Sequence, residues 1–367
     1  MTARWADYVI AFGGPDDLPA SLWQAAAESC EGARSMFVLG VGFDPRALVA
    51  LRQFLHLDHQ TPPIVGRIAL PPPSAGSGAS ARSMASANQE AFLELVAGIE
   101  VREIEHQEVH APSNAGPRVA RALTSSNFMA EVGHVVIDIS SLPANLYFPI
   151  VAATLTSVDR QVPGFPLEIQ VVACENPEVD AAIIKLGVSE AAVVGGFRGA
   201  LEHESEPTGT VIWAPVLGEH AGPALRAIHD FLGPGDVCPI LPFPARNARR
   251  ADNLLLEFQV ELLDMFRVTP GNLIYADERN PFDLYRTLAL LQEKYRHALK
   301  ALEPTTLTLS THSSKLLSLG ALLAAYEYSL PIVAASALDY EVGELDLASV
   351  KAGNHVTCTW LTGRPYR

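Results

Sequence analysis

The chain has 367 residues, of which 49% are hydrophobic and 18% are charged. This length suggests two domains, and the hydrophobic share excludes a largely disordered chain. Acidic residues number 41 against 26 basic ones, and the formal net charge of −15 argues against non-specific binding of nucleic acid, because the phosphate backbone attracts positive surfaces.

The first half of the chain alternates apolar runs of strand length with amphipathic stretches of helix length. The strand runs are almost continuously apolar, which is typical of strands buried on both faces of a parallel sheet. The small polar segment 74–86 predicts a mobile loop. The predicted elements are an additional strand within 5–13, a strand, loop and helix over 37–55, a short strand over 64–73, a helix over 83–95, a strand and helix over 134–155, and strands over 167–175 and 192–198.

The second half of the chain contains the same kinds of element in the same order. Phe54 corresponds to Phe231 in this comparison, and Ser140 corresponds to Ser310. Six elements that recur in one order indicate a tandem duplication. The second set consists of a strand, loop and helix over 211–232, a short strand over 237–244, a helix over 248–263, a strand and helix over 305–328, and strands over 330–337 and 359–364.

The alternation of strands and helices predicts the α/β class. We expect two tandem Rossmann-like units, each a mostly parallel sheet with helices on both faces, related by a pseudo-two-fold axis. The acidic stretch 201–209 contains Pro and Gly and few apolar residues, so it is the best place for a boundary. This boundary gives a first unit over 1–204, including the additional N-terminal strand, and a second unit over 205–367.

The loop that follows the first strand of each unit is a candidate ligand site. Ligands of open α/β sheets bind at the carboxyl ends of the strands, where helix N-termini offer free N–H groups. The alternative is structural, with Asp44 and Arg46 forming an ion pair at the start of the helix. The candidate residues are Gly40, Gly42, Phe43, Asp44 and Arg46 in the first unit and Gly218 and Glu219 in the second.

The loop after the fourth strand of each unit carries a denser set of polar side chains. Hydroxyl groups and a lysine at a helix N-terminus bind phosphate or another polar group of a ligand. The alternative is helix capping, because Ser and Thr are preferred at helix starts. The candidate residues are Ser140, Ser141 and Asn145 in the first unit and Ser310, Thr311, His312, Ser313, Ser314 and Lys315 in the second.

Two further clusters are rich in charge. Arg279 and Asn280 lie in a polar segment that follows an apolar strand, so they are candidate ligand residues; an Asn–Pro turn with a solvated face is the alternative. The run 246–250 contains three arginines and is the only dense basic stretch. This run could bind a phosphate or an acidic partner. A solvated helix start explains it equally well.

Several kinds of catalytic or metal site are disfavoured by the sequence. The loop GVGFDPR resembles the glycine-rich loop of nucleotide-binding Rossmann folds and the GxGxD-R pattern of leucine-carboxyl-type methyltransferases, but Pro45 and Arg46 stand where a third glycine is expected. His106, Glu108 and His110 share one strand face, yet their polar surroundings favour surface histidines over a metal site. The four cysteines are far apart, which excludes a CxxC zinc or redox motif.

The tandem organisation and the sequence STHSSKLLSLGALLAA resemble the CARF/SAVED superfamily, the sensor domains of prokaryotic antiviral systems. The resemblance implies that Ser310–Lys315 occupies the place of a T-G-x-K-type loop and that Gly40–Arg46 forms the loop after the first strand. It also implies a cyclic oligonucleotide bound across two fused units. The sequence departs from that pattern, because Thr311 and His312 replace the glycine pair and Asn145 stands where the first unit would carry a lysine.

From these observations we expect a ligand-sensing module rather than an enzyme. It would bind a nucleotide-like anion, such as a cyclic oligonucleotide, in the cleft between the units and would signal to a protein effector. We expect no cofactor, no metal and no membrane association, and a cytoplasmic location. The alternatives are a nucleotide-processing enzyme or S-adenosylmethionine-dependent methyltransferase that uses the GVGFDPR loop, and a structural subunit of a defence complex with degenerate pockets.

Overall fold

The computed structural model describes residues 3–13, 20–30, 32–73, 78–104, 115–199, 210–298, 305–343, 345, 350 and 353–366. The chain forms two compact units. The split unit consists of Tyr8–Gly187 and Leu338–Arg367, and the inserted unit consists of Val188–Ala337 together with Met1–Asp7. Each unit is described below by itself.

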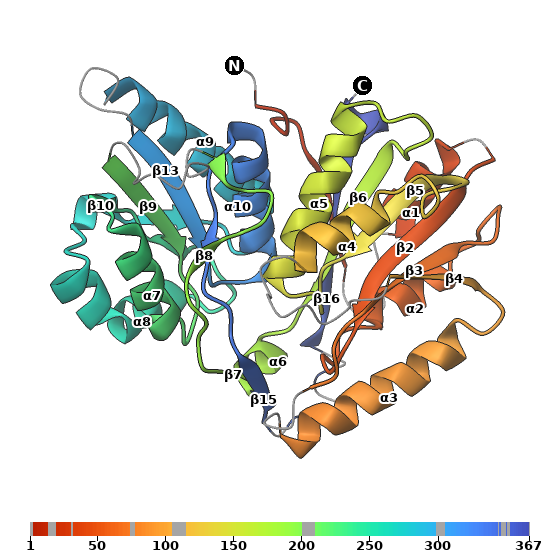
Figure 1. Cartoon of the computed structure of the whole chain (residues 1–367), viewed down its shortest axis with the longest axis horizontal. Coiled ribbons are helices and arrows are strands. Elements are labelled where there is room, and N and C mark those ends of the chain that lie inside the picture. The colour runs from red at the N-terminus through yellow and green to blue at the C-terminus, as the bar shows by residue number, and fades with distance from the viewer. Residues whose placement is uncertain are drawn as a thin grey trace. The chain divides into compact units, whose positions relative to one another are not determined.

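The split unit is built on a seven-stranded sheet with the order β1-β16-β6-β5-β2-β3-β4 (Figure 1). Strands β2 to β6 are parallel, whereas β16 runs antiparallel to β6 and β1 runs antiparallel to β16. The strands are β1 (Val9–Gly13), β2 (Arg34–Val41), β3 (Ile64–Ala69), β4 (Glu100–Ile104), β5 (Val132–Asp138), β6 (Glu168–Glu175) and β16 (His355–Thr362).

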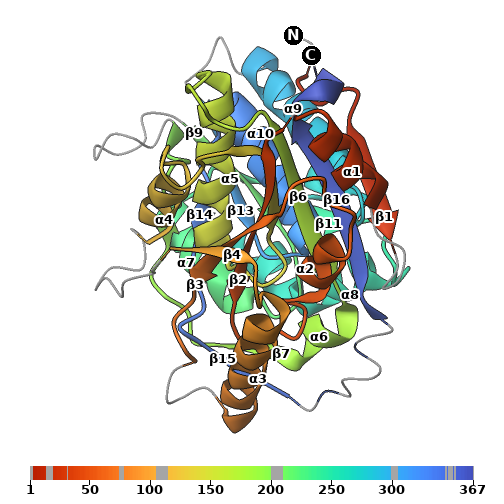
Figure 2. The same cartoon turned by 90° about the vertical axis from the view of Figure 1, so that its right-hand side faces the viewer.

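Helices cover both faces of this sheet. Figures 1 and 2 show α4 and α5 on one face and α1 and α2 on the other. On the second face, the rings of Trp23, Phe37 and Phe54 contact one another within the hydrophobic core. The helices are α1 (Ala20–Glu28), α2 (Val49–Leu55), α3 (Ala79–Leu95), α4 (Ala115–Leu123), α5 (Ala144–Asp159) and α6 (Pro177–Ala182). The unit also contains a short antiparallel pair of strands, β7 (Ile183–Leu186) and β15 (Asp339–Val342), and a 3₁₀ turn at Arg364–Tyr366.

The inserted unit has a smaller sheet in which every pairing is parallel. Strand β13 pairs with β9, β9 pairs with β10 and β11, and β11 pairs with β12. Trp213, Leu225 and Leu254 belong to the core between this sheet and its helices. The elements are β9 (Thr210–Val216), β10 (Asp236–Val237), β11 (Ile240–Pro242), β12 (Ile274–Ala276), β13 (Thr305–Thr311), the antiparallel pair β8 (Ala192–Val193) and β14 (Val333–Ala334), α7 (Gly222–Leu232), α8 (Arg250–Glu257), a π-helix (Val260–Met265), a 3₁₀ turn (Pro270–Asn272), α9 (Pro281–Ala298) and α10 (Lys315–Tyr328).

The α/β class with mostly parallel sheets is confirmed. The position of the last strand differs from the expectation: the sequence pattern predicts the strand within 359–364 in the second unit, but β16 lies in the seven-stranded sheet. The expected boundary at 201–209 lies outside the described residues. The expected loop over 74–86 is wrong from residue 79 onward, because α3 begins at Ala79. Alanine, arginine and methionine, which fill this stretch, are strong helix formers.

A row of polar side chains crosses the middle of the split unit's sheet. His134 on β5 is fully buried, and its two ring nitrogens lie 3.1 Å from the Ser35 hydroxyl on β2 and 3.1 Å from the Gln170 side-chain oxygen on β6. Burial lowers the pKa of His134 to about 4. The hydrogen bond to Gln170 raises this pKa in part, and the charge of nearby His59 lowers it slightly. The folded unit therefore holds this imidazole neutral at pH 7.

We expect His134 to make stability depend on pH. Because the pKa is lower in the folded state, the unfolded chain binds the proton first, so stability is full above pH 6.5 and is lost as the pH falls toward 4. Between pH 7.5 and 6 the loss should be about 1 kcal/mol. Urea unfolding at several pH values measures it. His134→Gln should flatten this part of the profile, and an unchanged profile in that variant would contradict the assignment.

None of the helices in the described residues has the length and apolar character needed to cross a bilayer.

Candidate functional site

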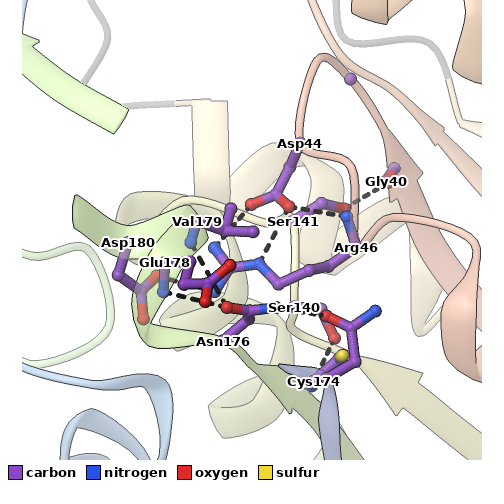
Figure 3. Close-up of polar contacts among 12 residues, drawn as sticks. Gly40, Asp44, Arg46, Ser140, Ser141, Cys174, Asn176, Glu178, Val179 and Asp180 are labelled. Carbon is purple, nitrogen blue, oxygen red and sulfur yellow. Dashed lines mark hydrogen bonds and ion pairs between the residues drawn. The ribbon is translucent and has the colours of Figure 1, made fainter. Parts of the chain in front are cut away.

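The loop after β2 in the split unit is held by a buried arginine between two carboxylates (Figure 3). The Arg46 Nε and Nη2 atoms donate to the two carboxylate oxygens of Asp44 at 2.9 and 2.8 Å, and Nη1 donates to Asp180 Oδ1 at 2.7 Å. The Arg46 side chain is 4% exposed and that of Asp44 is 11% exposed. This geometry agrees with the structural alternative, in which Asp44 and Arg46 pair at the helix start.

The charges of this cluster stabilise one another. Burial alone would lower the pKa of Arg46, but the carboxylates of Asp44 and Asp180 outweigh that effect and raise it well above its ordinary value. Because the guanidinium stays charged and its hydrogen bonds go to carboxylates, the cluster offers little to an anionic ligand.

The glycines of this loop serve close packing. A Cβ on Gly40 would lie 2.5 Å from Leu142 Cδ2, and one on Gly42 would lie 3.2 Å from Leu70. The Gly42 carbonyl accepts a hydrogen bond from the side chain of Asn88 at 2.8 Å. The ring of Phe43, the remaining candidate here, lies 5.7 Å from the ring of Tyr340.

The serines after β5 are engaged within the fold as well (Figure 3). The Ser140 hydroxyl donates to Asp138 and accepts from the backbone N–H of Cys174 at 2.7 Å, while the Ser141 hydroxyl donates to the Gly40 carbonyl at 2.5 Å. Burial raises the pKa of the Cys174 thiol above its ordinary value, so this cysteine is no nucleophile. Asn145 lies in the first turn of α5, where its carbonyl oxygen faces Gly116 on α4.

Helix α6, which is not among the predicted elements, supplies the second carboxylate of the cluster. Asn176 caps this helix by accepting from the N–H groups of Glu178 at 2.9 Å and Val179 at 3.4 Å. The order Asn, Pro, Glu at 176–178 is a helix-start signal that could have revealed it. The contact of Asp180 with Arg46, by contrast, joins residues 134 positions apart, and no local pattern indicates it.

The loop between β13 and α10 in the inserted unit contains the other serine cluster. The buried Ser310 hydroxyl accepts from Trp213 Nε1 at 3.0 Å and lies 3.0 Å from His312 Nε2. Ser314 caps α10 by accepting from the Leu317 N–H at 3.3 Å. The capping alternative is therefore correct for Ser314.

Ser313, between these two, is different. Its hydroxyl oxygen is shielded from solvent and has no hydrogen-bond partner among the described residues. A buried hydroxyl without a partner is unfavourable, by about 1–3 kcal/mol. Thr311 ends β13, and Lys315 is the first residue of α10. The structure thus places one hydroxyl without a hydrogen-bond partner and one lysine residue at the same helix start.

Gly218 sets the shape of this loop from the neighbouring strand. A Cβ at position 218 would lie 2.1 Å from the His312 carbonyl oxygen and 2.7 Å from the Ser313 Cα. Only glycine permits this approach. The β9–α7 loop therefore packs directly against the backbone that carries Ser313.

Glu219 takes part in a second arginine cluster. Arg250 donates to both carboxylate oxygens of Glu219, at 2.7 and 2.6 Å, and to Glu278. Burial alone would raise the pKa of Glu219, but Arg250 outweighs it and lowers that pKa. Glu219, a candidate ligand residue from the sequence, is thus engaged by Arg250, which also pairs with Glu278.

Arg279 and Asn280 form a turn before α9. The Asn280 side-chain oxygen accepts from the Phe282 N–H at 3.1 Å, and the Arg279 N–H donates to Asp277 at 2.9 Å. The Arg279 side chain is exposed. The Asn–Pro turn, given as the structural alternative, accounts for these contacts.

No group of three metal-ligating side chains occurs in the part of the chain that the structure describes. The residues His106, Glu108 and His110 lie outside it. A scan against protein-family models finds none that matches the chain. A search of curated proteins finds no significant match either.

Proposed function

We propose that the protein is a ligand-sensing module that binds a nucleotide-like anion at the β13–α10 loop of the inserted unit, the loop to which its resemblance to CARF domains assigns a T-G-x-K-type sequence. The observation that carries the proposal is the Ser313 hydroxyl, buried at the start of α10 without a hydrogen-bond partner. An acceptor oxygen of a ligand would satisfy it.

The start of α10 suits an anion on electrostatic grounds. The N-terminus of a helix carries a partial positive charge, which favours a negative group of a ligand there. The first turn of α10 contains Lys315. A phosphate there would meet the helix dipole, the ammonium and the hydroxyl together.

Duplication of the two units is part of the proposal. Each unit places one arginine between two carboxylates near the carboxyl ends of its strands, Arg46 in the split unit and Arg250 in the inserted unit. In the split unit, ion pairs hold the loop after β2 and hydrogen bonds engage the serines after β5, so we assign ligand binding to the inserted unit. These two engaged loops favour, as a second candidate, a structural subunit with degenerate pockets.

Replacement of Lys315 by alanine tests the proposed site. We expect Lys315→Ala to weaken ligand binding by about 1.5–3 kcal/mol, the range for a hydrogen bond to a charged group. The melting temperature of the ligand-free protein should barely change. A thermal-shift screen of nucleotides, cyclic oligonucleotides and S-adenosylmethionine identifies the ligand first, because specific binding raises the melting temperature.

Lys294→Ala is the matched control, because Lys294 is exposed on α9 of the same unit; it should leave binding unchanged. A clear loss of free-protein stability with unchanged affinity in Lys315→Ala would place the site elsewhere. Turnover of a ligand would favour the enzyme alternative. The absence of any shift in melting temperature across the screen would favour the structural subunit.

A further inference from the structure

Helix α8 and the π-helix that follows it use one face for the core of the inserted unit. Ala251, Leu254, Phe258 and Leu262 are buried in that core. These residues account for the packing of the segment, since a helix on a sheet needs one apolar stripe.

The opposite face of the same segment is also apolar, and it is exposed. Leu256 is 71% exposed, Val260 is 60% exposed and Leu263 is 57% exposed. All three lie on the exposed part of this segment, Leu256 in α8 and Val260 and Leu263 in the π-helix. We call these three residues the outer stripe. A segment that is apolar on both faces is normally covered on both, and no described residue covers the outer stripe.

Arginines lie at both ends of the outer stripe. Arg249 immediately precedes α8, and Arg267 follows the π-helix. Both side chains are exposed, and neither guanidinium makes a hydrogen bond or ion pair with any described residue. The acidic residues of the segment are Asp252, Glu257, Glu261 and Asp264; of these, Glu257 accepts from the His220 N–H at 2.7 Å and Glu261 pairs with Arg226.

We propose that the outer stripe docks an amphipathic helix of a partner protein. The partner helix presents apolar side chains to Leu256, Val260 and Leu263 and acidic side chains at its two ends to Arg249 and Arg267. Arginine and large apolar residues are typical of protein interfaces. An amphipathic partner helix binds such a surface through its own apolar face.

The two arginines argue for a partner protein rather than a second copy of this chain. A second copy on the same stripe would set these arginines against one another, whereas acidic side chains of a partner helix would pair with both. The inference does not depend on the ligand site, which lies on a different loop of the inserted unit.

A helical peptide library displayed on phage tests this proposal. We would select peptides of roughly 16 residues against the full chain, a length that covers the stripe with a turn to spare at each end. Selected peptides should carry apolar residues at helical spacing with Asp or Glu at both ends. Their affinity should fall at least about tenfold in Leu256→Asp, the range for loss of a central contact, and by a smaller factor in Arg249→Glu and Arg267→Glu.

The control is Leu290→Asp. Leu290 is 68% exposed on α9 of the same unit, so it matches Leu256 in residue type and exposure and should leave affinity unchanged. Peptides without acidic ends, or equal losses in both leucine variants, would overturn the proposal. Concentration-dependent dimerisation that Leu256→Asp abolishes would assign the stripe to a second copy instead. Circular dichroism of each variant verifies folding. A protein that binds the peptides but no nucleotide would contradict the proposed ligand site and not the docking surface.

Discussion

Arg46→Ala should lower the free energy of unfolding of the split unit by about 3–5 kcal/mol, the range for removal of one partner from a buried ion pair. The variant leaves the carboxylate of Asp44, whose side chain is 11% exposed, buried without its guanidinium partner. Asp180 is more exposed and regains water, so it contributes less to the loss. Urea unfolding followed by tryptophan fluorescence measures the change.

Arg52→Ala is the control for that experiment. Arg52 is exposed on α2 and its replacement should change stability by less than about 0.5 kcal/mol. The double variant Arg46→Met with Asp44→Asn removes both charges and should recover part of the stability lost in Arg46→Ala. A loss below 1 kcal/mol in Arg46→Ala would mean that Asp44 does not depend on this arginine.

Gly218→Ala should destabilise the inserted unit by up to about 3 kcal/mol, the cost of overpacking, and should abolish ligand binding at the β13–α10 loop. The added methyl group would overlap the His312 carbonyl oxygen, which is backbone and cannot rotate away. The loop must shift, and the Ser313 hydroxyl moves with it. Thermal unfolding and the nucleotide titration measure the two effects.

Gly271→Ala provides the matched glycine control, since a Cβ there meets nothing within 4 Å. It should change neither stability nor binding by a measurable amount. Normal nucleotide binding in a destabilised Gly218→Ala protein would separate the ligand site from the loop that Gly218 supports.

The strands buried on both faces were predictable because their pattern is local. The apolar runs that form β2, β5 and β9 predict strands regardless of which strands they pair with. The partner of β16 was not predictable, because an apolar strand pattern does not indicate which sheet the strand joins. Its place between β1 and β6 is decided by tertiary packing.

The sequence predicts which loops carry the candidate site residues, but not the contacts of their side chains. The serine and glycine positions lie near the carboxyl ends of the strands, as expected, but the partners of their side chains are distant in sequence. Arg250 reaches Glu219 across 31 positions and Ser310 receives its bond from Trp213 across 97. Burial and long-range pairing decide whether a polar side chain is free for a ligand, and local spacing does not encode either.

The position of β16 has a consequence for protein synthesis. This strand pairs along β6 on one side and β1 on the other, yet it is translated after the whole inserted unit. While the ribosome is still adding residues 188–337, the nascent split unit exposes the edge of β6, and an unpaired strand edge invites aggregation. The inserted unit therefore has time to assemble first, and the sheet of the split unit closes last.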